Sequence, residues 1–165
     1  MLTLTSMLQT QIVRDLQGFI REVEAFPDDV TLWDVRPGVA NSAGNLSLHV
    51  CGNLQYFVGH ALGGTGYARQ RDREFGQRSG TRADVVNELR TTIAVMESVL
   101  PTVGADALAG DHPGGPGGLK LNTGQFFLHL GAHLAFHLGQ AGYLRRVVTG
   151  ENSSTGPLPL GPIAG

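Results

Sequence analysis

Apolar residues recur at the three- to four-residue spacing of an amphipathic helix in four stretches of the chain. We expect helices over residues 4–26, 45–62, 81–100 and 123–150. None of the remaining segments shows the alternation of a β-strand. The pattern therefore predicts an all-α fold, a four-helix bundle, formed by a single domain over residues 1–150.

The segments between these helices differ in length and composition. Residues 63–80 form a long connection rich in Gly and Arg, and residues 102–122 contain the flexible run HPGGPGG. A connection as long as residues 63–80 allows the second and third helices to run parallel. Residues 151–165 are rich in Pro, Gly and Ser without periodicity, so we expect a tail that is irregular or draped over a neighbour.

Several single residues are expected to fix the ends of these elements. Thr81 and Asp84 have the spacing of a capping box at the start of the third helix, and Thr123 is expected to cap the fourth. Gly150 follows the last turn, where glycine commonly ends a helix. Trp33 is expected to anchor the loop before the second helix to the body of the bundle.

Three of the six histidines lie in the fourth helix, at positions 129, 133 and 137. Residues four apart lie about 6 Å apart on one face of a helix, so two such imidazoles can reach one metal ion. The helical wheel places His137 at the centre of the apolar stripe and His133 on its inner edge, while His129 lies further round. We interpret His133 and His137 as candidate ligands; the alternative is a pair of hydrogen-bonded core histidines.

The second expected helix carries a polar line on an otherwise apolar surface. His49, Asn53, Tyr56 and His60 fall on this line. His49 and His60 stand about 16 Å apart along the helix axis, so only one of them can join a given ion.

Composition and charge narrow the possible functions. The net charge of −2 argues against a broad nucleic-acid surface, and no apolar run approaches the eighteen or so residues that span a bilayer. The N-terminal segment lacks the basic start and apolar core of a signal peptide, so we expect a cytoplasmic protein. The single Cys51 cannot form an internal disulfide and is expected to be a buried apolar residue.

Three segments together resemble the DinB superfamily: His49-Val-Cys-Gly52-Asn53-Leu54, Arg71-Asp72-Arg73-Glu74-Phe75 and His133-Leu-Ala-Phe-His137-Leu-Gly139-Gln140. The resemblance covers nearly the whole chain up to Gly150. It implies a bundle with up-down-down-up connectivity that binds a divalent metal through one histidine of the second helix and an HxxxH pair of the last. Carried over to this chain, the ligands are His49, His133 and His137. Many members of the superfamily have Arg directly after the last ligand, where this chain has Leu138.

Three neutral imidazoles would leave a bound ion with its full charge and an open position, as in catalytic sites. Zinc and nickel both suit nitrogen ligands. Asn53 and Gln140 each lie one turn after a ligand and are candidates to support it, or else ordinary amides between helices. Tyr56 is a candidate general acid or a core tyrosine. The Arg-rich residues 69–78 are interpreted as a solvated, internally paired loop, with anion capture as the alternative.

The resemblance implies a metal-dependent enzyme with a small-molecule substrate, either a transferase that uses a low-molecular-weight thiol or a hydrolase. The second hypothesis is a non-catalytic metal-binding protein with a role in stress or assembly. Haem held by two histidines is the weaker cofactor alternative, because no attachment motif is present. The sequence assigns no role to His60 or His129.

The side of the fourth helix opposite the histidines is also apolar. It carries small residues together with two large apolar ones: Gly131, Ala132, Ala135, Gly139, Gly142, Leu128 and Phe136. A helix that is apolar on every side is normally buried on every side, so we expect a second copy of the chain to cover this face in a homodimer. The alternative is that the linker over residues 102–122 or the tail covers it within a monomer.

Overall fold

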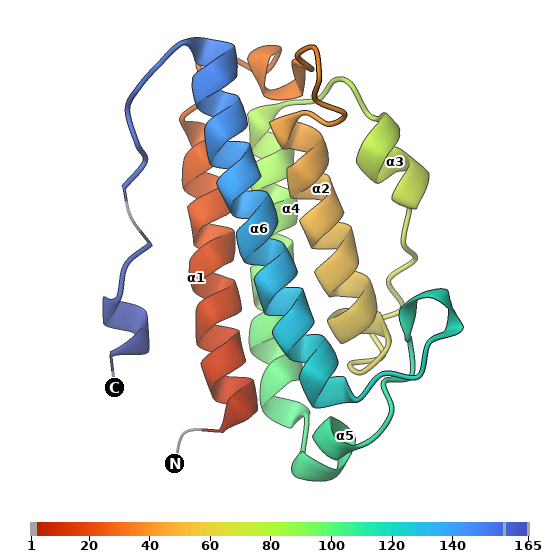
Figure 1. The fold of residues 1–165 in the computed structure, drawn as a ribbon. Helices are drawn as coiled ribbons and strands as arrows, with labels where there is room; N and C mark the ends of the chain where they lie inside the picture. The colour runs from red at the N-terminus through yellow and green to blue at the C-terminus, as the bar shows by residue number, and fades with distance from the viewer. Residues whose placement is uncertain (1–2, 157, 165) are drawn as a thin grey trace.

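The computed structural model describes residues 3–156 and 158–164, and it confirms the all-α fold. Four long helices form the bundle: α1 (Leu4–Glu24), α2 (Ala43–Leu54), α4 (Arg82–Val99) and α6 (Thr123–Thr149). In Figure 1, α1 and α6 run upward while α2 and α4 run downward, which is the expected up-down-down-up connectivity. The described residues contain no strand, only one isolated bridge between Asp111 and Asn122.

The four helices pack as a square in which α1 and α2 each contact both α4 and α6. Their apolar stripes meet in one core, where Leu16, Phe19, Leu89, Leu130 and Leu134 are at most 1 % exposed. None of the helices among the described residues has the length and apolarity needed to span a membrane. The packing places α2 beside α6 in antiparallel orientation, so side chains near the middle of both helices face each other.

The predicted helix ends are partly confirmed. Thr81 and Asp84 form the expected capping box of α4, and Gly150 ends α6 in the left-handed conformation with φ = 73°. The prediction that Thr123 caps α6 was wrong. Asn122 is the cap and accepts a hydrogen bond from the Gln125 N–H, because Thr123 already has helical backbone angles and turns its side chain into the interior.

The second helix is not a single α-helix over residues 45–62. After α2 the chain continues as a π-helical turn, η2 (Gln55–His60), in which the Ala61 N–H donates to the Tyr56 carbonyl. This register leaves the Phe57 carbonyl without a helical donor, and it accepts instead from Nε2 of His112 at 2.9 Å. A single π-helical turn is too short to give a periodic signal of its own, so the sequence pattern did not reveal it.

Both long connections contain short helices that were expected to be loops. Residues 63–80 include α3 (Arg71–Gly76), which the Asn45 amide holds by donating to the carbonyls of Glu74 and Gln77. Residues 102–122 include α5 (Ala105–Ala109) and bury His112 against the Phe57 and Phe126 rings. Helices of five or six residues are too short to give a periodic signal, and contacts with the bundle stabilise them.

Trp33 anchors the loop before α2, as expected. Its side chain is buried against Gly44, and its indole N–H donates to the Gly80 carbonyl at 2.8 Å. The hydrogen bond joins the loop before α2 to the loop before α4. Trp33 therefore fixes the upper end of the bundle.

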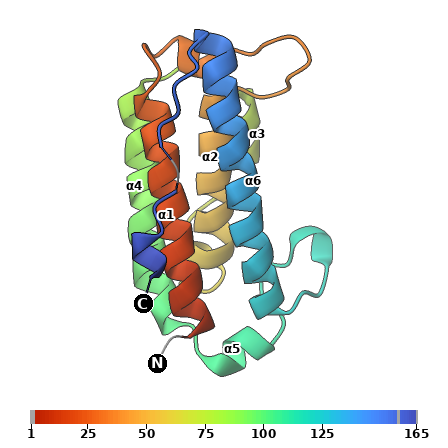
Figure 2. The same cartoon turned by 60° about the vertical axis from the view of Figure 1, so that its left-hand side comes forward.

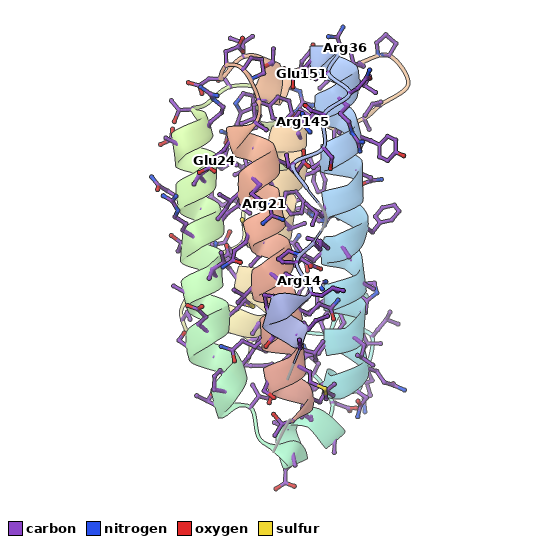
Figure 3. All side chains as sticks on the ribbon, turned by 90° about the vertical axis from the view of Figure 1, so that its left-hand side faces the viewer. Arg14, Arg21, Glu24, Arg36, Arg145 and Glu151 are labelled. Carbon is purple, nitrogen blue, oxygen red and sulfur yellow. The ribbon has the colours of Figure 1, made fainter. Side chains whose placement is uncertain are left out.

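The tail runs back along α1 and the neighbouring side of α6, as Figure 2 shows. Arg145 of α6 is 1 % exposed, and it donates to Glu22 of α1 at 2.7 Å and to the Ser153 carbonyl at 2.8 Å. Figure 3 shows Arg145 near the upper end of α6, close to Glu151 of the tail. The tail is irregular except for η5 (Gly161–Ile163), which packs on α1, and residues 157 and 165 lie outside the described residues.

The small-residue face of α6 is partly covered by the same chain. Gly131 lies against Leu8 and Gln11, and Gly142 lies against Glu22, all on α1. These two glycines are therefore buried between α6 and α1 of the same chain. The expected dimer face was wrong in including them. The exposed remainder consists of Leu128, Ala132, Ala135, Phe136 and Gly139, and we call it the outer stripe of α6.

Candidate metal centre

His49 of α2 and His133 and His137 of α6 meet across the interface between the two helices. Nε2 of His133 lies 3.2 Å from Nε2 of His49 and 3.1 Å from Nε2 of His137. One ring nitrogen of each residue falls within 4.8 Å of the others, so the three could hold a metal ion. His49 is buried, while His133 and His137 are partly exposed.

The hydrogen bonds of the outer ring nitrogens fit a metal at the centre. Nδ1 of His49 donates to Glu74 at 2.9 Å, and Nδ1 of His137 donates to Oε1 of Gln140 at 2.7 Å. The Nε2 atoms of His49 and His137 then both carry a lone pair that faces Nε2 of His133. His133 has at most one proton on Nε2, so hydrogen bonding alone cannot satisfy both lone pairs. Two nitrogens bound to one tetrahedral zinc at about 2.0–2.1 Å lie about 3.3 Å apart, close to the spacing observed.

The environment keeps the two α6 ligands neutral, as metal binding requires. Burial, together with smaller contributions from the neighbouring His137, His49, His129 and Arg69, lowers the pKa of His133 to about 4. Burial also lowers the pKa of His137, although its hydrogen bond with Gln140 opposes that change. At neutral pH both rings therefore carry a free lone pair.

Glu74 supports His49 from the side away from the other two histidines. Its carboxylate accepts from His49 and receives two hydrogen bonds from Arg69, each of 2.8 Å. Burial on its own raises the pKa of Glu74, but the hydrogen bonds from Arg69 and His49 outweigh it and hold the pKa at about 2. Glu74 is thus an anion at any working pH and fixes the tautomer and orientation of His49.

Gly52 makes room for this carboxylate. A Cβ on Gly52 would lie 2.2 Å from Oε1 of Glu74, much closer than any real contact. Gly52 lies three residues after His49, so the same turn of α2 that carries the ligand also admits its partner.

The other candidate residues lie around the centre with different partners. Gln140 contacts His137 directly, as described above. The Oδ1 of Asn53 is buried and has no hydrogen-bond partner among the described residues, so it does not hydrogen-bond a ligand. Tyr56 stacks on the exposed His60 ring at 5.5 Å, about two turns from His49 along the helix.

The remaining histidine of α6 and the single cysteine stay outside the centre. His129 is exposed and stacks on His133 at 5.8 Å between ring centroids, and it does not belong to the group that could hold the ion. Cys51 is buried, and burial raises the pKa of its thiol. A buried, protonated thiol is not a nucleophile, which agrees with its expected role as an apolar residue.

Comparison with known proteins identifies the family of this chain. The sequence profile of the DinB superfamily matches residues 11–141. The chain belongs to the DinB superfamily. No curated protein sequence matches it. Among solved structures, the DinB-superfamily chain is similar to a conserved protein from Enterococcus faecalis with 14 % sequence identity and a TM-score of 0.75. The alignment covers 92 % of this chain and 100 % of that one, and it shows a shared fold.

Sequence reasoning missed Arg69 and Glu74 as parts of the centre. Both lie in the Arg-rich segment that was interpreted as a solvated, internally paired loop. They are indeed paired with each other, but the pair is mostly buried against His49, with side-chain exposures of 13 % and 5 %. Gly52 was the feature of the sequence that could have indicated such a partner. A glycine one turn after a ligand leaves space beside it for a side chain from another segment.

Proposed function

We propose that this protein is a cytoplasmic metal-dependent enzyme that activates a low-molecular-weight thiol for transfer to an electrophile. The observation that carries the proposal is the convergence of three Nε2 atoms at a place where two of the three rings remain partly exposed. Three protein ligands with one side open to small molecules are typical of catalytic metal sites, whereas structural zinc sites use four. Zinc and nickel are the proposed ions, since imidazole suits both.

The residues around the centre favour a thiol over water as the activated group. A hydrolase normally needs a free base beside the metal. Glu74 is the carboxylate adjacent to the described ligands, and both of its oxygens are occupied by Arg69 and His49. A bound divalent ion would supply a Lewis acid that deprotonates a coordinated thiol without any protein base.

The protein's own contribution is to orient the ligands and hold their protons. Glu74 and Gln140 keep the Nδ1 protons of His49 and His137, so the Nε2 atoms stay available. The low pKa of His133 keeps its ring neutral down to about pH 4. A thiol reaches the centre from the partly exposed side formed by the α6 ligands.

Metal loading followed by a panel of thiols tests the proposal. Elemental analysis of protein incubated with zinc or nickel should give about one ion per chain. Cysteine, glutathione and 2-mercaptoethanol are then added to the loaded protein, and a thiol that binds the centre at 100 times its Kd stabilises the fold by about 2.7 kcal/mol. A protein that refuses both metals contradicts the proposal, and one that binds metal but no thiol supports the hydrolase or the non-catalytic alternative instead.

Single alanine variants assign the ligands. His49→Ala, His133→Ala and His137→Ala should each remove most of the zinc affinity, measured by competition with a chromogenic chelator. His60→Ala and His129→Ala are the matched controls, because His60 lies on the turn η2 that continues α2 and His129 lies on α6, both outside the ligand group, and each should bind zinc as the wild type does. Loss of zinc in either control would show that the ligand set is wrong.

We also propose that two copies of the chain pair through the outer stripe of α6. Phe136 is 62 % exposed and Leu128 is 56 % exposed on this stripe, and small residues separate them. Large apolar side chains on an otherwise covered helix favour a partner of the same kind, and glycine and alanine let that partner approach closely. Neither the linker nor the described part of the tail covers these two side chains.

A further inference from the structure

A hollow of about 480 Å³ lies next to the candidate metal centre, between α6 and the loop before α2. Its walls are mainly apolar and include Val39, Leu46, Tyr143, Leu144 and Val147. Two of its lining residues lie one helical turn from a histidine of the centre: Leu46 precedes His49 on α2, and Gln140 follows His137 on α6 and accepts from its Nδ1 at 2.7 Å. The hollow therefore lies about one helical turn from two of the three histidines, along the same pair of helices.

The size and chemistry of the hollow indicate what it holds. Pockets for small organic molecules usually measure about 300–1,000 Å³, whereas a coordinated water needs only about 30 Å³. No charged residue lines the hollow among the described residues, so it offers nothing to balance a charged group. On the far side of His49, by contrast, the surroundings are the charged pair of Arg69 and Glu74.

We propose that the substrate of the metal centre carries an uncharged apolar group, alkyl or aryl, which lies in this hollow while the reacting atom faces the three histidines. The inference rests on the proposed function and specifies its substrate class. Gln140 links the two parts of the site, because its Oε1 accepts from His137 and the same residue lines the hollow.

A series of straight-chain thiols measures the hollow directly. Ethanethiol, butanethiol and hexanethiol are titrated into the zinc-loaded protein by calorimetry, so that sulfur binds at the centre and the chain samples the adjoining space. Each methylene group that is buried should raise the affinity about fourfold, and hexanethiol should bind on the order of 10²-fold more tightly than ethanethiol. Val147→Arg places a charge in the wall and should flatten the series without changing zinc affinity.

Val30→Arg is the matched control, because Val30 is 80 % exposed and does not line the hollow. It should keep the wild-type dependence on chain length. If ethanethiol, butanethiol and hexanethiol bind with equal affinity, the hollow is not a substrate site, while the open metal centre stands. A steep series that survives Val147→Arg overturns the hollow as a substrate site as well. Failure of every thiol to bind the zinc-loaded protein instead contradicts the proposed function itself.

Discussion

Replacing Gly52 by Ala tests how far the metal centre depends on the space beside His49. The added Cβ would lie 2.2 Å from Oε1 and 2.8 Å from Cδ of Glu74. The carboxylate has nowhere to move without giving up its hydrogen bonds, since Arg69 and His49 hold both oxygens. We therefore expect the substitution to expel Glu74 and to leave His49 without a fixed tautomer.

The structure sets the size of the effect. The pKa of Glu74 is about 2 in the folded protein and 4.5 in its ordinary state, a difference worth about 3 kcal/mol of stability. Because the folded pKa is the lower one, this stabilisation is complete above pH 4.5 and is lost as the pH falls toward 2. Alanine stabilises a helix by about 1 kcal/mol relative to glycine, which offsets part of this loss. The net loss of about 2 kcal/mol should lower the Tm by about 4–8 °C at pH 7.

Zinc affinity and thermal stability are both measured on Gly52→Ala. Loss of the partner of a metal-bound histidine typically costs 10- to 100-fold in affinity, which a chelator competition resolves. The Tm difference from wild type, measured without metal, should shrink as the pH is lowered from 4.5 toward 2. Gly76→Ala is the control, since a Cβ there meets nothing within 4 Å. The reasoning is refuted if Gly52→Ala binds zinc normally and is as stable as Gly76→Ala.

Two further predictions concern assembly and pH. Light scattering at micromolar concentration should give twice the mass of one chain. Ala135→Glu should reduce the mass to that of one chain, because its carboxylate would be buried in the dimer contact without a partner. A wild-type monomer contradicts the dimer. Burial lowers the pKa of His112 below its ordinary 6.5, so its contribution to stability should be full above pH 6.5 and decline as the pH falls below it. Urea unfolding between pH 5 and 7.5 should show a steeper decline for the wild type than for His112→Gln, and equal slopes would show that His112 does not contribute.

The long helices were predictable because they bury one face over several turns, whereas their up-down-down-up connectivity was implied by the family resemblance. Apolar spacing alone located all four, and the Thr81 box and Gly150 fixed two of their ends. The short helices α3 and α5 and the turn η2 could not be found in this way. Their stability comes from single tertiary contacts, such as the Asn45 amide on α3 and His112 on the Phe57 carbonyl, which leave no repeat in the sequence.

The candidate site shows the same limit. Helical spacing selected His133 and His137, the family resemblance added His49, and the structure brings all three together. It also places Gln140 on His137, one turn after the ligand, as local geometry suggested. Glu74 comes from another segment, 25 residues after His49, and its position depends on how the connection folds back on α2. Local spacing carries no information about such a partner.

The pairing of Glu74 with Arg69 has a consequence for the chemistry of the centre. A carboxylate that accepts from a metal-bound histidine makes that ring a stronger donor, but its negative charge would also weaken the electrophilic character of the ion. Arg69 binds both oxygens of Glu74 and cancels this charge within the protein. At His137 the same position is taken by the neutral amide of Gln140. The three imidazoles and their hydrogen-bond partners therefore add no net charge. A bound divalent ion would keep its full charge, and none of the described residues that line the hollow beside it carries a charge that would offset it. A full charge on the ion lowers the pKa of an incoming thiol.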